Sequence, residues 1–407
     1  MAFGDSPDDV ALRAAWRAFC ARLADAGDRA FKDHNPASPL QRADAFRFLT
    51  QNLGQAFDLA LETRDTRFPQ LHAFCNPTRK LGGDCADFTY LQAWIDGQSA
   101  YRITGNRGTA RFFNITVQGP RPERMANGAP PLHEPFGDTP EANLFGHQLQ
   151  TAPEGGFELY IGGAERGPNW LATTPGSRKL FIRQGFDRWD ERPATMHIER
   201  IGMTGPKPLP TPQTMIGAMD WAGNFLTGMM DDWPDWPFAH GGVDPAHPNA
   251  FPALANTGDD KKRGRAATNM HWAIGPDEAL IVGFEAHEGL WMLTNMGAFF
   301  TSMDFLYRPV SYTPSRTRVD SDGLIRLVMA HDDPGYHNWI DTQGFERGNL
   351  TYRHMLEGAP VPLGARLVKR AELAGALPAE SARVTPAQRV EQMRARFNGV
   401  RQRYAPG

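Results

Sequence analysis

The stretch "MMDDWPDWPFAHGG" brings three carboxylates, two indoles and one histidine together in fourteen residues. Asp231, Asp232 and Asp235 follow the D-D-x-x-D spacing with which class I isoprenoid enzymes hold magnesium and diphosphate on a helix face. Pro234 argues against that interpretation, because a helix usually ends at or before the residue that precedes a proline. We therefore expect Asp235 to lie beyond the end of a helix, and we predict that this stretch forms the rim of a pocket.

Carboxylates near a helix C-terminus face the negative end of the helix dipole. We expect a cation to compensate them: a histidine, an arginine from elsewhere in the chain, or a divalent ion. Large aromatic residues beside Pro and Gly often build a pocket wall, and carboxylate and imidazole groups serve as general acids and bases. The predicted catalytic residues are Asp231, Asp232, Asp235 and His331, and the predicted substrate contacts are Trp233, Trp236, Phe238, His240, Phe300 and Trp339.

A second polar cluster lies in "MAHDDPGYHNWIDTQG", where two histidines and three carboxylates fall within eleven residues. Neutral imidazole and carboxylate are ligands for zinc, iron or manganese. The spacing is not diagnostic of a metal site, and a structural turn whose Asp side chains cap backbone amides is the alternative. We expect no organic cofactor and keep a divalent metal open, with His331, Asp333, His337 and Asp341 as its candidate ligands.

The elements that must position these residues are a few helices and many short strands. Helical periodicity dominates residues 1–80, one internal stretch and the end of the chain. Three of the helices open with a cap residue followed by proline, at Ser38–Pro39, Thr211–Pro212 and Thr385–Pro386.

From about Leu81, short apolar or alternating runs such as "ARFFNITVQG", "KLFIRQGF" and "EALIVGFEA" are separated by turn residues. Strands at such spacing indicate an antiparallel sandwich. We predict a mainly β chain, a jelly-roll-like antiparallel β-sandwich with N-terminal helices, one internal helix and a C-terminal helix. The expected regions are a helical part at 1–80, a sandwich domain at 81–375 and a helical tail at 376–407.

Composition excludes several classes of function. The net charge of −3 lacks the basic excess of nucleic-acid-binding proteins. No signal sequence and no apolar run of about 18 residues is present, so we expect a cytoplasmic protein without membrane insertion. Cys20, Cys75 and Cys85 are too few for a disulfide framework. Nucleophile-elbow, Walker and dinucleotide motifs are absent.

The residues from "DEALIV" to "YRHMLEGAPVP" resemble the C-terminal signature of the bacterial domain-of-unknown-function family 1214. Its D-N-P-D motif is replaced here by Asp84-Cys85-Ala86-Asp87, which puts a shared activity in doubt. The resemblance implies a jelly-roll-like sandwich and no particular chemistry. The matching positions are Asp277 to Leu280, Asp320 to Gly323, Asp333 to Gly335, Asn338, Trp339, Asp341, Thr342, Gly344 and Arg353.

We predict an enzyme that acts on a small, largely apolar organic substrate of the terpenoid, steroid or aromatic alcohol type. Its chemistry would be acid–base lyase, isomerase or hydrolase chemistry without a nucleotide cofactor, because nucleotide and nucleophile motifs are missing. Two alternatives stay open: a magnesium-dependent isoprenoid-diphosphate enzyme that uses the three aspartates, and a non-catalytic β-sandwich that binds carbohydrate or another ligand. The expected partners are the small molecule and, through the terminal helices, a second copy of the chain.

Overall fold

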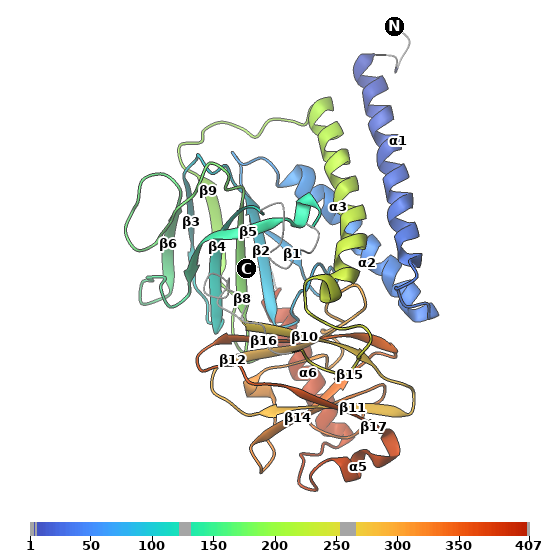
Figure 1. Ribbon diagram of the computed structural model, residues 1–407. Helices are drawn as coiled ribbons and strands as arrows, with labels where there is room; N and C mark the ends of the chain where they lie inside the picture. Colours follow the sequence, from blue (N-terminus) through green and yellow to red (C-terminus); the bar gives the residue numbers. More distant parts are fainter. Residues whose placement is uncertain (1–3, 5, 122–131, 253–265, 405–407) are drawn as a thin grey trace.

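The computed structural model describes residues 4, 6–121, 132–252 and 266–404 (Figure 1). Its described strands form four sheets, which pack in pairs as two sandwiches. The prediction of a mainly β fold with N-terminal, internal and C-terminal helices is confirmed. The segment predicted as one sandwich domain contains two sandwiches, each with a core of its own.

The first sandwich pairs a sheet of order β1-β2-β8-β4-β5 with a sheet of order β7-β6-β3-β9. Leu180 and Ile182 of β8 point into the core between these sheets. Because side chains alternate along a strand, Lys179, Phe181 and Arg183 point to the opposite face. The strands are β1 His72–Cys75, β2 Phe88–Trp94, β3 Tyr101–Asn106, β4 Phe112–Pro120, β5 Asp138–Phe145, β6 Gly156–Ile161, β7 Trp170–Leu171, β8 Lys179–Gly185 and β9 Thr195–Arg200.

The second sandwich pairs the order β10-β16-β12-β13 with the order β15-β14-β11-β17. Trp272 and Tyr352 fill its core, so Thr351 and Arg353 of β16 point out of the sandwich. The strands are β10 Ala266–Ala273, β11 Glu278–Glu285, β12 Leu290–Met296, β13 Ser311–Tyr312, β14 Leu324–Ala330, β15 Trp339–Asp341, β16 Arg347–Leu356 and β17 Gly364–Lys369.

Helices cover the outer face of the first sheet, with α1 and α3 side by side (Figure 1). The predicted caps Ser38, Thr211 and Thr385 each accept a hydrogen bond from the first helical turn. No described helix is long and apolar enough to cross a bilayer. The helices are α1 Pro7–Asp28, α2 Pro39–Phe57, α3 Pro212–Ala239, α5 Leu373–Ala376 and α6 Pro386–Arg403, with short turns η1 Arg29–Phe31, η2 Asp58–Glu62, η3 Glu134–Phe136, η4 Pro314–Arg316 and η5 Arg370–Glu372.

Helix α3 is longer than the sequence predicted. It continues through Pro234 and Pro237 to Ala239, so the expectation that Asp235 lies beyond the helix is wrong. An interior proline costs a helix about 3 kcal/mol. Both prolines are buried, and α3 packs against α1 and α2, so tertiary packing offsets this cost.

A buried charge network joins the two sandwiches to α6. Asp87, directly before β2, contacts Arg316 Nη2 at 2.6 Å and Arg403 Nη1 at 3.1 Å. Burial disfavours the charged carboxylate, but Arg316 and Arg403 outweigh it and hold the pKa of Asp87 well below its usual value. The indole of Trp189 lies against the guanidinium groups of Arg316 and Arg403.

Candidate functional site

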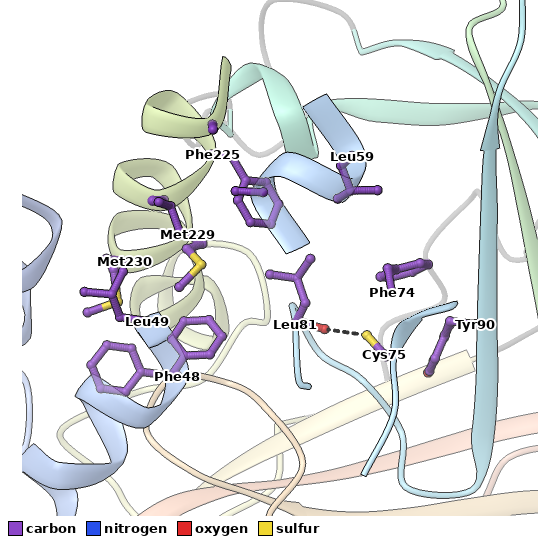
Figure 2. Packing of buried hydrophobic residues seen from close by; sticks show 14 of the residues in the cluster. Phe48, Leu49, Leu59, Phe74, Cys75, Leu81, Tyr90, Phe225, Met229 and Met230 are labelled. Carbon is purple, nitrogen blue, oxygen red and sulfur yellow. Dashed lines mark hydrogen bonds between the residues drawn. The ribbon is translucent and has the colours of Figure 1, made fainter. Parts of the chain in front are cut away.

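A cavity of about 220 Å³ lies where the helices and both sandwiches meet. Its walls come from the outer face of the first sheet, from α3, from the outer faces of β10 and β16, and from the loop Leu81 to Gly83. Figure 2 shows Leu81 between Phe225 of α3 on one side and Phe74 and Tyr90 of the first sheet on the other. The cavity is therefore assembled from segments far apart in the sequence.

Aromatic side chains form the apolar part of the wall. Trp221, Phe225, Trp233 and Trp236 all line the cavity from α3, at spacings that place them on one helix face. Trp236 stacks on Phe300 with ring centroids 4.7 Å apart. Of the six predicted substrate contacts, Trp233, Trp236 and Phe300 line this cavity.

Two glycines let the loop approach these rings. A Cβ atom at Gly82 would lie 2.4 Å from Trp233, and one at Gly83 would lie 2.8 Å from Phe300. Both glycines also have positive φ angles, which side-chain-bearing residues rarely adopt. The backbone N–H of Gly83 donates to the carbonyl of Phe300 at 2.7 Å. The loop is thus held against the aromatic wall.

The polar part of the wall is strongly cationic. Among the described residues, four cationic residues and one carboxylate, Asp138, line the cavity, in a chain whose net charge is −3. Asp138 lies 2.6 Å from Lys179 Nζ, and its other oxygen lies 2.6 Å from Arg178 Nη2. The side chain of Asp138 is only 2% exposed, and both Asp138 and Lys179 line the cavity. The four cations are Arg121, Lys179, Arg183 and Arg353.

Arg353 is 4% exposed, and its guanidinium is only partly engaged. Its Nη2 donates to the carbonyl oxygen of Gly83 at 2.5 Å. Its Nε and Nη1 are buried without a hydrogen-bond partner among the described residues, and so is Nε1 of Trp233. A buried donor without an acceptor costs about 1–3 kcal/mol, so these groups favour a ligand that accepts hydrogen bonds.

The predicted catalytic aspartates are not among the residues that line the cavity. Asp231 accepts hydrogen bonds from Arg29 at 2.8 Å and from Lys32, and Asp235 lies 2.8 Å from His34 Nε2. Burial raises the pKa of Asp231, but Lys32 and Arg29 outweigh burial and lower it below its usual value. Both aspartates connect α3 to the segment that follows α1.

Asp232 binds His133, which precedes η3. The backbone N–H of His133 donates to one carboxylate oxygen at 2.8 Å, and the ring Nδ1 lies 2.8 Å from the other. The hydrogen bond that His133 donates to Asp232 raises the pKa of His133 despite partial burial. Because Leu132 lines the cavity, Asp232 positions one of its walls.

We expect Asp232→Asn to lower the free energy of unfolding more at pH 5.5 than at pH 8.5. A raised folded-state pKa stabilises the fold below the unfolded value near 6.5, and this contribution is lost as pH rises through the folded pKa. The His133 side chain is 35% exposed, so solvent screening limits the charge effect to about 1 kcal/mol or less. Urea unfolding at the two pH values measures it.

The matched control is Asp244→Asn, which removes the exposed Asp244–His247 pair. We expect no measurable pH-dependent difference for this control. If Asp232→Asn lowers the free energy of unfolding by the same amount at both pH values, the charged interaction with His133 is contradicted.

The predicted metal ligands have structural partners. His331 donates from Nε2 to the Ile274 carbonyl at 3.2 Å, and its Nδ1 lies 2.7 Å from the Thr342 hydroxyl. No group of three or more His, Cys, Asp or Glu side chains is placed to hold a metal within the described ranges. The remaining partners are Arg389 for Asp333, Asn338 for His337 and Arg308 for Asp341.

Three predicted substrate contacts lie outside the cavity lining. Trp339 is buried in β15 and donates from Nε1 to the Ala330 carbonyl at 3.2 Å. Phe238 packs edge-on against His271, with ring centroids 5.4 Å apart. Burial lowers the pKa of His240, the residue that caps α3.

The polar residues of the cavity were not predicted as site residues. In the sequence, Arg353 is a position of the family 1214 pattern with no role attached, and no motif marks Asp138 or Lys179. The available signal is the alternation in "KLFIRQG", which puts Lys179 and Arg183 on the face opposite the apolar core residues. The alternation does not say what this face of β8 contacts. That depends on the sheet order, in which β8 lies between β2 and β4.

Comparisons with known proteins support the fold. No family model matches the chain, and no curated protein matches it. A crystal structure of an uncharacterized protein from Burkholderia cenocepacia is 28% identical, with a TM-score of 0.77 over 88% of this chain and 97% of that chain. A protein from Vibrio parahaemolyticus is 12% identical, with a TM-score of 0.41 over 84% of this chain and 100% of that chain. The fold is therefore similar to that of the Burkholderia protein.

Proposed function

We propose that this protein is an enzyme that binds a small, largely apolar organic molecule in the cavity beside α3. The observation that carries the proposal is an aromatic-walled cavity with the ion pair Asp138–Lys179 in its wall. Small-molecule sites commonly have this composition, with mostly apolar walls and a few convergent polar groups. Terpenoid and steroid substrates fit such walls through apolar contact, and aromatic substrates fit through ring stacking as well.

We assign the acid–base chemistry to Asp138 and Lys179. Asp138 is the only carboxylate among the described residues that line the cavity. A carboxylate held 2.6 Å from an ammonium group can accept a substrate proton while the lysine returns one. Such an exchange suits isomerase, lyase or hydrolase reactions without a nucleotide. Asp231, Asp232 and Asp235 then act as positioning residues of α3.

A non-catalytic sugar-binding surface is less well supported. A sugar-binding surface would present flat indoles to solvent, on which sugar rings stack. Trp233 and Trp236 instead line the cavity, where Trp233 packs edge-on against Phe136 and Trp236 stacks on Phe300. This packing favours a ligand enclosed by the rings.

From the D-P-G-x-x-N-W-x-D-T run we also infer that the second sandwich is related to family 1214.

The proposal is tested by filling the cavity. Ala267 lines it from β10, and Ala267→Trp places an indole inside. Wild type and variant are incubated with a bacterial metabolite extract, and apolar compounds that disappear are identified by mass spectrometry. We expect depletion by wild type and at least about tenfold slower depletion by the variant, because a filled pocket excludes the substrate.

The matched control is Leu367→Trp, an aromatic substitution at a position of β17 that is 40% exposed. This control is expected to deplete the same compounds at the wild-type rate. The proposal fails if wild type depletes no apolar compound, or if Ala267→Trp depletes it as fast as wild type does.

A further inference from the structure

We propose that the ligand of this cavity is a carboxylic acid, and that Arg353 and the indole N–H of Trp233 bind its carboxylate. The inference rests on the proposed function of the cavity and names the class of ligand that the cavity takes. It is carried by donors that are buried in the wall without an acceptor.

The guanidinium of Arg353 is held by one hydrogen bond, and two of its nitrogen donors lack a partner among the described residues. The bond from Nη2 to Gly83 holds one edge of the group, while Nε and Nη1 have no partner among the described residues. Nε and Nη1 lie on different edges of the planar guanidinium, and each edge is completed by Nη2, so a carboxylate can accept from one of them together with the second Nη2 hydrogen. A side chain that is 4% exposed cannot satisfy these donors in bulk water, so a ligand inside the cavity is the natural acceptor.

A second donor packs against the same loop. Trp233 packs so closely over Gly82 that a Cβ atom there would lie 2.4 Å from its ring. Arg353 binds the carbonyl of the next residue, Gly83. The indole Nε1 of Trp233 is also buried without a partner in the described part of the chain. The two side chains therefore flank one dipeptide, and their free N–H groups can serve one acceptor.

The neighbouring residues favour an anion of modest charge. The Arg353 guanidinium in the cavity wall carries a positive charge, which favours a negative ligand. Asn269 lines the cavity beside Arg353, and its Oδ1 accepts a hydrogen bond from Thr351 at 2.7 Å, so its NH₂ group can donate to an anion. The aromatic wall then holds the apolar body of the acid. These features together fit an aryl or terpenoid carboxylic acid.

Calorimetric titration with three probes of one shape tests the assignment: 2-naphthoate, 2-naphthamide and 2-naphthyl phosphate. We expect wild type to bind 2-naphthoate at least about tenfold more tightly than 2-naphthamide, because a buried charged hydrogen bond is lost with the amide. Arg353→Met keeps the apolar stem and removes the fork. It is expected to bind both probes with similar affinity, whereas the exposed-site control Arg366→Met keeps the wild-type preference.

Trp233→Phe keeps an aromatic ring in the wall but removes the indole N–H together with the second ring of the indole. We expect its affinity for 2-naphthoate to fall about threefold or more further than its affinity for 2-naphthamide, because the hydrogen bond to the charged acceptor is the stronger one. If Arg353→Met does not fold, Trp233→Phe tests the carboxylate assignment by itself. An unchanged affinity of this variant for 2-naphthoate would then overturn the inference.

The outcomes separate the two proposals. Equal binding of 2-naphthoate and 2-naphthamide by wild type overturns the carboxylate assignment and leaves the cavity as an apolar ligand site. Tighter binding of 2-naphthyl phosphate by tenfold overturns it in favour of a phosphate ester. Failure of wild type to bind any probe counts against the proposed function as well.

Discussion

Asp138→Asn is expected to reduce kcat by about 10²- to 10⁴-fold on the substrate identified by metabolite depletion. The amide neither accepts nor carries the proton that we assign to this carboxylate, and Lys179 loses its partner at 2.6 Å. KM is expected to change much less, because the aromatic wall and Arg353 bind the substrate. Steady-state kinetics with purified protein separates the two parameters.

Two further variants control for a purely structural effect of Asp138. Asp190→Asn removes a carboxylate that is 75% exposed and paired with Arg188, and it should leave kcat unchanged. Asp138→Glu restores the carboxylate and should recover part of the activity. A folded Asp138→Asn variant with wild-type kcat would remove Asp138 from the mechanism.

Asp87→Asn is expected to lower the free energy of unfolding by about 3–5 kcal/mol, the usual effect of removing one partner of a buried ion pair. Asp87 is fully buried, and the substitution leaves Arg316 and Arg403 without their carboxylate. The lowered pKa means that this contribution exists above the unfolded value near 3.8 and is lost as pH falls through the folded pKa. Urea unfolding at pH 7 and pH 3 measures both effects.

Asp277→Asn is the control for Asp87, because Asp277 is 74% exposed and pairs with Lys369 at the surface. It should change the free energy of unfolding by less than about 1 kcal/mol. If Asp87→Asn unfolds at the same urea concentration as Asp277→Asn, the network does not hold α6 and the two sandwiches together.

Local signals in the sequence were sufficient to predict the element types. Ser38, Thr211 and Thr385 cap helices as expected, because capping depends on residues a few positions apart. Alternating runs predicted strands for the same reason. The proline rule failed at Pro234 because it describes local cost, whereas the end of α3 is fixed by packing against distant helices.

The candidate site could be predicted only in part. Trp233 and Trp236 were recognised because they lie close together in one aromatic stretch, and Phe300 because it lies in a second. Asp138 and Arg353 come from strands of different sandwiches, β5 and β16, and no local pattern connects them. Their proximity to α3 follows from sheet order and from how the sandwiches pack, which sequence periodicity does not encode.

A crystal structure of the wild-type protein with 2-naphthoate tests the central claim most directly. We predict the naphthyl ring between α3 and the first sheet, in contact with Trp233 and Trp236, and the carboxylate within hydrogen-bond distance of Arg353. A ligand bound outside this cavity, or a cavity filled by its own side chains in the presence of saturating 2-naphthoate, would contradict the claim that this is the site where the protein binds its substrate.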